Sequence, residues 1–303
     1  MKNLILTTSF GYKYEQLSLF LRSLKKTGFD GDLVIFVSNT DARTIAKLKN
    51  DGVIVKKFFY PYRRCYKLRN PLARFWPLVR LLIERMQNCD LIQYFCIPVA
   101  NLMLLRNLLY RRFLQTSAGK YEYVFLTDLR DVYFQGNPFQ RVSKGELRVF
   151  LEEPNPTLEK CPNNSRWLRE LYGETILNEV TGKTIACAGT ILGDCATVLG
   201  YLDDMLLALR DAQSVTRMGV DQGIYNYLVH TGRTKNVTFL PNRDAEILTM
   251  GLMPKNEVFQ RDANGKLVDR NGTPYALLHQ FDRQAEVAKN AMATFQLSDP
   301  VSH

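Results

Sequence analysis

Residues 121–139 read YEYVFLTDLRDVYFQGNPF and join a buried-strand pattern directly to a cluster of charged residues. The run 123–127 is rich in β-favouring residues, which predicts a strand buried on both faces. Asp128, Arg130 and Asp131 follow this strand at once. Because ligands bind at the carboxyl ends of strands in open α/β sheets, two carboxylates and an arginine there predict a site for a metal ion and an anion. The alternative is a polar strand end that is solvated or paired internally through Arg130.

The composition is that of a globular protein with a sizeable core. The chain has 303 residues, of which 46% are hydrophobic and 23% charged. The apolar run at its start is too short for a signal peptide, and no stretch reaches the length of an uncharged membrane span. The six cysteines show no CxxC spacing, and only three histidines could join them in a zinc site. We therefore expect free thiols and a cytoplasmic protein.

A formal net charge of +10 predicts attraction to an anionic partner. Phosphorylated small molecules, acidic polysaccharide, anionic lipid and nucleic acid all fit this charge. No zinc finger, RNA-recognition signature or basic zipper accompanies it, so we do not expect nucleic acid as the partner. The basic residues cluster at Lys56, Lys57, Arg63, Arg64, Lys67, Arg69 and Arg74, and again at Arg106, Arg111 and Arg112.

The first 57 residues predict a parallel sheet. Strands are expected at 4–8, 32–38 and 52–57, with helices at 14–26 and 42–49 between them. This β-α-β-α-β order is typical of a sheet with helices on its faces. The GxGxxG fingerprint is absent after the first strand and GxxxxGK[ST] occurs nowhere, which disfavours dinucleotide dehydrogenases and P-loop enzymes.

Two apolar helices that are interrupted by basic residues are expected at 71–86 and 97–115. Core helices with a solvated edge are one interpretation, and a face that lies on a membrane surface, around residues 102–113, is the other.

The remainder of the chain continues the α/β pattern. Strands are expected at 147–152, 184–192 and 275–278, helices at 165–172, 197–209 and 221–229, and a hairpin at 264–272. Without an internal repeat or linker, the pattern predicts one domain over residues 1–285, followed by a looser tail at 286–303.

Four motifs in the order TDLRDVYFQGNPF, ACAGTILGD, DQGIYNYL and LLHQFDR resemble the GT-A class of nucleotide-sugar glycosyltransferases. The likeness covers nearly the whole chain and is closest to retaining families such as family 8. It implies a Rossmann-like mixed sheet with helices on both faces. The implied activity is transfer of a sugar from a nucleotide diphosphate, with a UDP-sugar as the expected donor and a glycan or glycolipid as the acceptor.

The same resemblance implies a bound Mn²⁺ or Mg²⁺. In the family, an acidic DxD motif at a strand end holds a cation that bridges the donor diphosphate, and a histidine near the C-terminus completes its shell. The matching positions here are Asp128, Asp131 and His279. The chain departs from the motif, because it has DxxD with Arg130 between the acids. A structural role is the alternative for His279.

The chemistry of transfer also requires groups around the sugar. Negative charge develops on the departing phosphate, and a hard cation can neutralise it, with Arg130 sharing that task. A carboxylate or carboxamide is needed on the sugar's other side, where Asp221 and Gln222 match the acid–amide pair of the resembling families. Helix capping is an alternative role for Asp221 and is compatible with catalysis.

Further residues are expected to contact the donor. Gly189 and Thr190 lie in an Ala-Gly-Thr segment, where the glycine would allow the backbone to approach the sugar closely, or would serve packing alone. Residues Thr7, Thr8 and Ser9 at the end of the first strand are expected to line the nucleotide pocket. Arg74 is expected to reach the diphosphate or the acidic motif, as an arginine in a similar position does in the resembling families. A surface charge is the alternative for Arg74.

Two functions of other classes are also compatible with these patterns. A nucleotidyltransferase that makes sugar nucleotides is one, although the expected GxGTR-like loop is missing at the N-terminus. A non-catalytic basic module that binds anionic lipid or polysaccharide is the other. The basic clusters exceed what a diphosphate needs, so we expect them to serve an anionic acceptor, such as an acidic glycan or a lipid-linked acceptor at the inner membrane face, or merely to maintain solubility.

Overall fold

The computed structural model describes residues 1–60, 70–215, 219–255 and 257–297. The five cysteines within these ranges are free thiols. Some of the predicted residues lie outside the described ranges. They are Arg63, Arg64, Lys67 and Arg69 of the basic cluster, the thiol of Cys65, and the last part of the predicted tail, 298–303.

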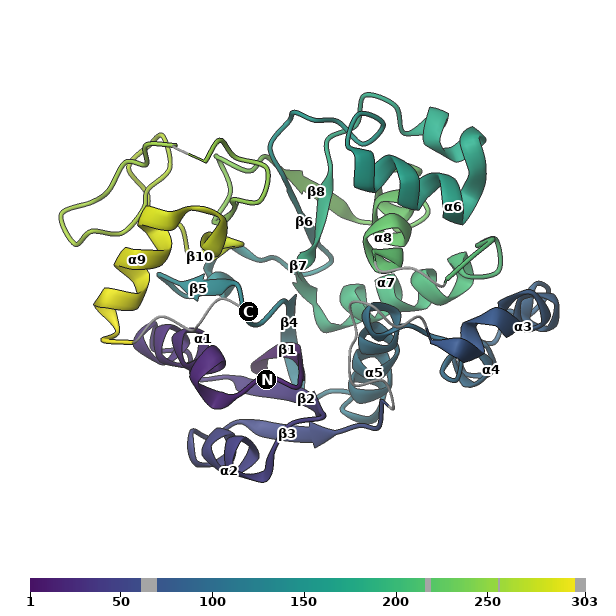
Figure 1. Ribbon diagram of the computed structural model, residues 1–303, viewed down its shortest axis with the longest axis horizontal. Helices are drawn as coiled ribbons and strands as arrows, with labels where there is room; N and C mark the ends of the chain where they lie inside the picture. The colour runs from purple at the N-terminus through teal and green to yellow at the C-terminus, as the bar shows by residue number, and fades with distance from the viewer. Residues whose placement is uncertain (61–69, 216–218, 256, 298–303) are drawn as a thin grey trace.

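The expected mixed α/β sheet is confirmed (Figure 1). Its strands, in spatial order, are β3 (Ile54–Lys57), β2 (Asp32–Ser38), β1 (Lys2–Phe10), β4 (Tyr121–Thr127), β7 (Ala186–Asp194), β6 (Leu147–Leu151) and β8 (Val237–Leu240). Strands β1 to β4 pair in parallel, as do β6 and β8, whereas β7 is antiparallel to both of its neighbours. The carboxyl ends of β1, β4 and β6 therefore meet at one edge.

A second, smaller sheet lies next to this edge. It comprises β5 (Val132–Phe134), β10 (Leu277–His279) and β9 (Ile247–Thr249). Four residues, 128–131, separate the end of β4 from the start of β5, so the charged segment forms the connection between the two sheets. None of the short strands β5, β8 and β9 was expected, because runs of three or four residues give too little alternation to be recognised.

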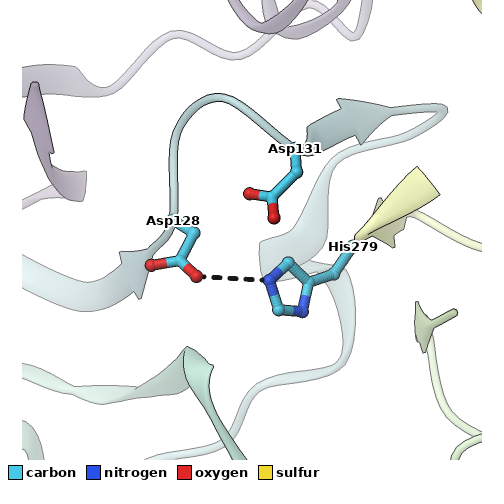
Figure 2. Close-up of side chains that lie close together, drawn as sticks. All are labelled: Asp128, Asp131 and His279. Atoms are coloured by element: carbon cyan, nitrogen blue, oxygen red, sulfur yellow. Dashed lines mark hydrogen bonds and ion pairs between the residues drawn. The ribbon is translucent and has the colours of Figure 1, made fainter. Parts of the chain in front are cut away.

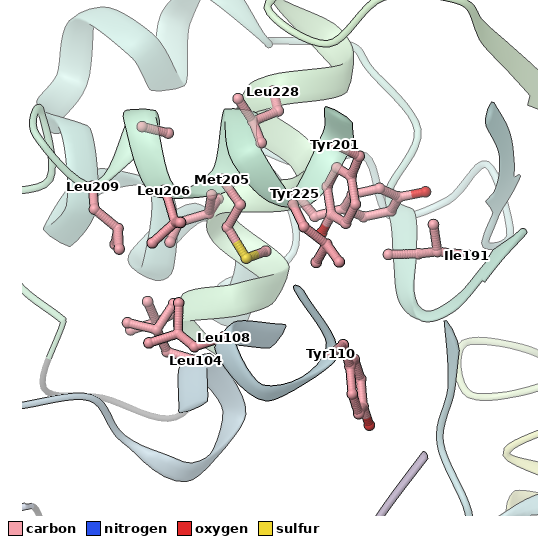
Figure 3. Close-up of a cluster of buried hydrophobic side chains, with 14 of the residues drawn as sticks. Leu104, Leu108, Tyr110, Ile191, Tyr201, Met205, Leu206, Leu209, Tyr225 and Leu228 are labelled. Atoms are coloured by element: carbon pink, nitrogen blue, oxygen red, sulfur yellow. The ribbon is translucent and has the colours of Figure 1, made fainter. Parts of the chain in front are cut away.

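Helices cover both faces of the large sheet. Alternate residues of β1 separate the two cores: Ile5 packs with Leu17 and Phe20 of α1 on one face, and Leu4 and Leu6 belong to the larger core on the other. Figure 3 shows the larger core, where leucines of α5 and α7 lie near tyrosines of α7 and α8, with Ile191 of β7 beside these tyrosines. The helices are α1 (Tyr14–Lys26) and α2 (Ala42–Asn50) on the first side, and α5 (Leu102–Thr116), α6 (Pro162–Glu179), α7 (Cys195–Ala208) and α8 (Val220–His230) on the second.

The expected helix over 71–86 divides into a 3-10 turn, η1 (Pro71–Phe75), and α3 (Trp76–Ile83). Pro77, at the start of α3, lacks the N–H that one continuous helix would require. The expected helix over 97–115 starts later, at Leu102, and is preceded by an unforeseen helix, α4 (Cys89–Cys96). The apolar residues of α5 are buried or pack partly buried against the large core, which supports the core interpretation of this helix and leaves the membrane-face interpretation without support.

The expected hairpin near residue 267 is replaced by two successive tight turns. Asp262 and Asp269 each accept hydrogen bonds from two backbone N–H groups that follow them, and only isolated bridges connect the flanking segments. These aspartates close the turns locally, which leaves no ladder to extend. Beyond η3 (Phe281–Arg283), the segment expected to be looser starts with helix α9 (Ala285–Thr294), whose Val287 and Met292 pack in a third core cluster.

Among the helices that the structure describes, none combines the length and the apolar character that crossing a bilayer requires.

Candidate functional site

The charged segment after β4 lies between the two sheets. Asp128 continues the β4–β7 pairing by one hydrogen bond, from its backbone N–H to the carbonyl of Gly189 at 2.9 Å. Asp131 comes immediately before β5, which pairs antiparallel with β10 so that His279 lies opposite Val132. The sheet topology therefore brings the two aspartates next to a histidine about 150 residues away in sequence.

The three side chains converge (Figure 2). One ligand atom from each of Asp128, Asp131 and His279 lies within 4.8 Å of the other two. His279 Nε2 is 3.3 Å from an Asp128 carboxylate oxygen. Two carboxylates and one imidazole form a donor set that fits Mn²⁺, and also Mg²⁺ with water completing the shell. The triad is thus a possible divalent-cation site, as the sequence predicts.

His279 is fully buried and held from both ring nitrogens. Its Nδ1 lies 3.3 Å from the sulfur of Cys187 and 3.5 Å from the hydroxyl of Thr249. Burial lowers the pKa of His279, but the Cys187 sulfur and the carboxylates of Asp128 and Asp131 together raise this pKa well above its ordinary value. These contacts fix the ring so that Nε2 faces the aspartates.

Arg106, on α5, links the strand end to α8. One guanidinium nitrogen donates to Asp128, and the other donates to Asp221 over 2.7 Å. Burial lowers the pKa of Arg106, yet the two carboxylates raise it well above the usual value. For Asp128, burial raises the pKa, but the charges of Arg106 and His279 more than offset this and hold it well below the normal range. Asp128 is therefore a carboxylate at neutral pH.

Asp131 differs from Asp128 in its charge environment. Burial, with the charges of Asp128 and Asp282 adding to it, raises the pKa of Asp131, while His279 acts in the opposite direction. A cation that approaches the triad would favour the ionised form of this carboxyl group.

Gly189 allows the aspartate and the histidine to approach each other. A Cβ atom at this position would lie 2.6 Å from His279 Cε1 and 2.7 Å from an Asp128 carboxylate oxygen. Its neighbour Thr190 is buried opposite Thr127 of β4. This close approach supports the packing interpretation of Gly189.

Gln222 and Asn226 anchor α8 to the first residues of β7. The Gln222 side chain accepts from the N–H of Ala188 and donates to the carbonyl of Ala186, both at 2.8 Å. Asn226 makes equivalent contacts with the N–H and carbonyl of Ala186. Both polar groups of the Gln222 amide are thus engaged by backbone, so this residue positions α8.

Asp221 is not the N-cap that the sequence suggests. Gly219 occupies the cap position with a φ of 86°, and Asp221 lies in the first turn of α8. A carboxylate there interacts favourably with the positive end of the helix dipole. Its side chain is buried against Arg106, which brings it to the edge of the site.

The three hydroxyl residues of β1 do not share one surface. Thr7 and Ser9 are completely buried on the α1 side of the sheet. Thr8 points to the other side and forms a 2.7 Å hydrogen bond with the hydroxyl of Tyr110, one turn after Arg106 on α5. Of the three, Thr8 alone faces the side on which Arg106 lies.

Arg74 and Arg130 are both exposed side chains. Arg74 is exposed on η1, with its guanidinium 4.8 Å from the centre of the Phe75 ring. Arg130 is exposed and pairs with Asp282 at 3.2 Å. The arginine that pairs with the acidic motif is Arg106, which the sequence pattern classes only as part of a basic cluster. A single arginine within the apolar run 102–109 is the signal that could have identified it.

Glu152 is a further carboxyl group near the triad. It follows β6, and its backbone N–H donates to the carbonyl of Ile185, the residue before β7. Burial raises the pKa of Glu152 to about 7, and the nearby charge of His279 partly opposes this shift. The sequence carries no signal for this residue beyond its position at the end of a strand.

Comparison of the sequence with protein-family models and with curated proteins finds no match. The family is therefore not identified by similarity, and the functional argument depends on the geometry of the site.

Proposed function

We propose that this protein is a glycosyltransferase that uses a nucleotide-diphosphate sugar and a divalent cation. The observation that carries the proposal is the convergence of Asp128, Asp131 and His279 at the carboxyl edge of the mixed sheet. This edge is where open α/β folds bind their ligands. The GT-A-like order of the sequence motifs, two of which contain the triad residues, agrees with this proposal.

In this proposal, each site residue has a separate task. Asp128, Asp131 and His279 hold Mn²⁺ or Mg²⁺, which supplies positive charge to the departing diphosphate. Arg106 fixes the orientation of Asp128 and places a second positive charge behind it. Asp221 is the carboxylate that faces the sugar, and Gln222 fixes the helix on which Asp221 lies.

The proposed donor is a UDP-sugar and the proposed acceptor a glycan or glycolipid. The cation and one arginine are enough to neutralise the diphosphate of the donor. The chain carries a net charge of +10, which is more than this task requires. The remaining charge suits an anionic acceptor or surface.

A thermal-shift series with UDP, GDP and ADP, each with Mn²⁺ or with a chelator, tests the proposal. We expect one diphosphate to raise the melting temperature, and only when Mn²⁺ is present. A ligand at 100 times its dissociation constant stabilises the folded state by about 2.7 kcal/mol, which such a scan resolves. No shift with any nucleotide would support a non-catalytic binding module.

A second assay separates transfer from nucleotide activation. A nucleotidyltransferase would release pyrophosphate from a nucleoside triphosphate and a sugar 1-phosphate, whereas a glycosyltransferase releases a nucleoside diphosphate from the sugar nucleotide. Asp128→Ala and Asp131→Ala should each abolish the release of nucleoside diphosphate and leave the circular dichroism spectrum unchanged. Near-normal turnover in both variants would disprove the proposed role of the triad.

A further inference from the structure

Helices α3 and α4 carry an unusual apolar surface on their outer side. Figure 1 shows both helices at one end of the molecule, beyond α5. The exposed fractions reach 61% for Leu78, 64% for Leu81 and 72% for Tyr94. We name this surface the α3–α4 face; its main residues are Phe75, Leu78, Leu81, Leu82, Leu91 and Tyr94.

The inner side of the same helices is also apolar, and it is anchored to the body of the protein. Trp76 and Ile83 of α3 and Ile92 of α4 are buried in the large core. The indole N–H of Trp76 donates to the carbonyl of Ala212 over 2.9 Å. On α4, Asp90 pairs with the buried Arg111 at 2.6 Å. The outer residues are therefore held facing outwards, because the opposite side of each helix is already occupied.

A helix that is apolar on all sides is normally buried on all sides. The spacing of Phe75, Leu78 and Leu82 places them in one stripe of α3, and Leu91 and Tyr94 form a second stripe on α4. Contiguous apolar surface of this kind on a water-exposed protein marks a binding surface. Within the part of the chain that the structure describes, nothing covers these side chains.

The charges around this face select the partner. Arg74 and Arg85 are exposed on the same helical segment, where Glu84 lies 3.9 Å from Arg85, and the Arg74 guanidinium stacks on the ring of Phe75. Such a pair exposes an aromatic ring and a cation together, as residues at a lipid–water interface do. The chain as a whole carries a formal net charge of +10, which favours an anionic partner. Leucine and aromatic side chains bordered by arginine are typical of helices that lie on anionic bilayers.

We propose that the α3–α4 face docks on an anionic membrane surface. The leucine, phenylalanine and tyrosine side chains enter the boundary between head groups and acyl chains, and Arg74 and Arg85 contact lipid phosphates. This surface replaces the buried α5, on which the sequence placed a membrane contact. The inference goes beyond the proposed transferase activity and does not depend on it.

Co-sedimentation of the full chain with lipid vesicles tests the proposal. One vesicle type contains phosphatidylcholine alone, and the other contains phosphatidylcholine mixed with phosphatidylserine. We expect binding to the anionic vesicles that weakens as salt rises, and much weaker binding to the neutral ones. The double variant Leu78→Glu/Leu81→Glu should reduce vesicle affinity by about tenfold or more, because it removes apolar area and adds negative charge. Arg74→Glu/Arg85→Glu should reduce binding to anionic vesicles selectively.

Two exposed residues outside the α3–α4 face provide matched controls. Val258 is 90% exposed, and Val258→Glu makes the same kind of change outside the α3–α4 face. Arg270→Glu is the equivalent control for charge. Because all of these side chains are exposed, melting temperatures should stay close to that of the unmodified protein.

Three results would overturn the proposal. The first is no sedimentation with anionic vesicles at low salt, and the second is an equal loss of binding in the Val258→Glu control. The third is a dimer in analytical ultracentrifugation that Leu78→Glu/Leu81→Glu dissociates, in the absence of vesicle binding. That outcome would assign the α3–α4 face to a second copy of this chain. No nucleotide is present in these experiments, so their failure would leave the transferase proposal unaffected.

Discussion

The guanidinium of Arg106 lies 2.7 Å from the carboxylate of Asp221, although 115 positions separate the two residues in sequence. The same guanidinium also contacts Asp128, so a single side chain joins α5, the end of β4 and the start of α8. All three side chains are largely removed from water. An arginine can hold two carboxylates in this way because its planar group presents several donors in fixed directions.

Replacement of Arg106 by alanine should therefore destabilise the protein by about 3–5 kcal/mol, since it removes the counter-charge of the buried Asp221 and leaves Asp128 with His279 alone. Arg106→Lys keeps the charge but cannot contact both carboxylates, so we expect an intermediate loss. Urea denaturation measures both changes. Arg74→Ala removes an exposed arginine and should alter stability by less than about 0.5 kcal/mol. Equal effects at the two positions would contradict the bridging role of Arg106.

Mn²⁺ should bind to the triad. Asp131→Asn should weaken this binding at least about tenfold, because a neutral amide does not replace the charged carboxylate ligand. Electron paramagnetic resonance of free Mn²⁺ measures the affinity directly, after dialysis against a chelator. Asp30→Asn is the control, since Asp30 is exposed and lies outside the triad. Unchanged Mn²⁺ affinity in Asp131→Asn would show that the cation, if bound, lies elsewhere.

The sequence predicted the parts of the fold that depend on local patterns. The β-α-β-α-β start and the charged end of β4 follow from runs of apolar residues and their interruption. The approach of His279 to Asp128 was expected only through the resemblance of motifs. The pairing of β10 with β5 explains it physically, but a three-residue strand gives no periodic signal.

Features that depend on tertiary partners could not be predicted in this way. Arg106 looks like a surface charge in a helix until α5 is packed against the strand ends, where two acids from distant segments meet it. Leu78 and Leu81 look like core residues, because composition does not reveal which side of a helix is covered. Burial of Glu152 likewise depends on how β6 and β7 are aligned.

Gly189→Ala should reduce stability by about 1–3 kcal/mol, because a Cβ atom there overlaps both the His279 ring and the Asp128 carboxylate. The displacement of these side chains should also weaken Mn²⁺ binding. Gly200→Ala, in α7, is the matched control, since no atom lies within 4 Å of its added Cβ. Alanine in a helix interior should stabilise the protein by up to about 1 kcal/mol. Melting temperatures that rise in both variants would disprove the steric argument.

Glu152→Gln should stabilise the metal-free protein at alkaline pH and have no effect in acid. The unfolded carboxyl group ionises near its ordinary pKa of 4.5, whereas burial raises the pKa of Glu152 in the folded protein to about 7. Between these values the unfolded state loses its proton first, so the stability of the unmodified protein falls as pH rises through this window.

Glutamine does not ionise and avoids this loss, so the variant should exceed the unmodified protein by about 3 kcal/mol at pH 8 and match it near pH 4. Denaturation in urea across this pH range, in the presence of a chelator, measures the difference. Glu84→Gln makes the same chemical change on an exposed side chain and should give no such pH-dependent gain. If Glu152→Gln instead lowered stability at pH 8, the carboxylate of Glu152 would have to be ionised and paired in the folded protein. Glu152 would then be a further metal ligand or an ion-pair partner of the triad.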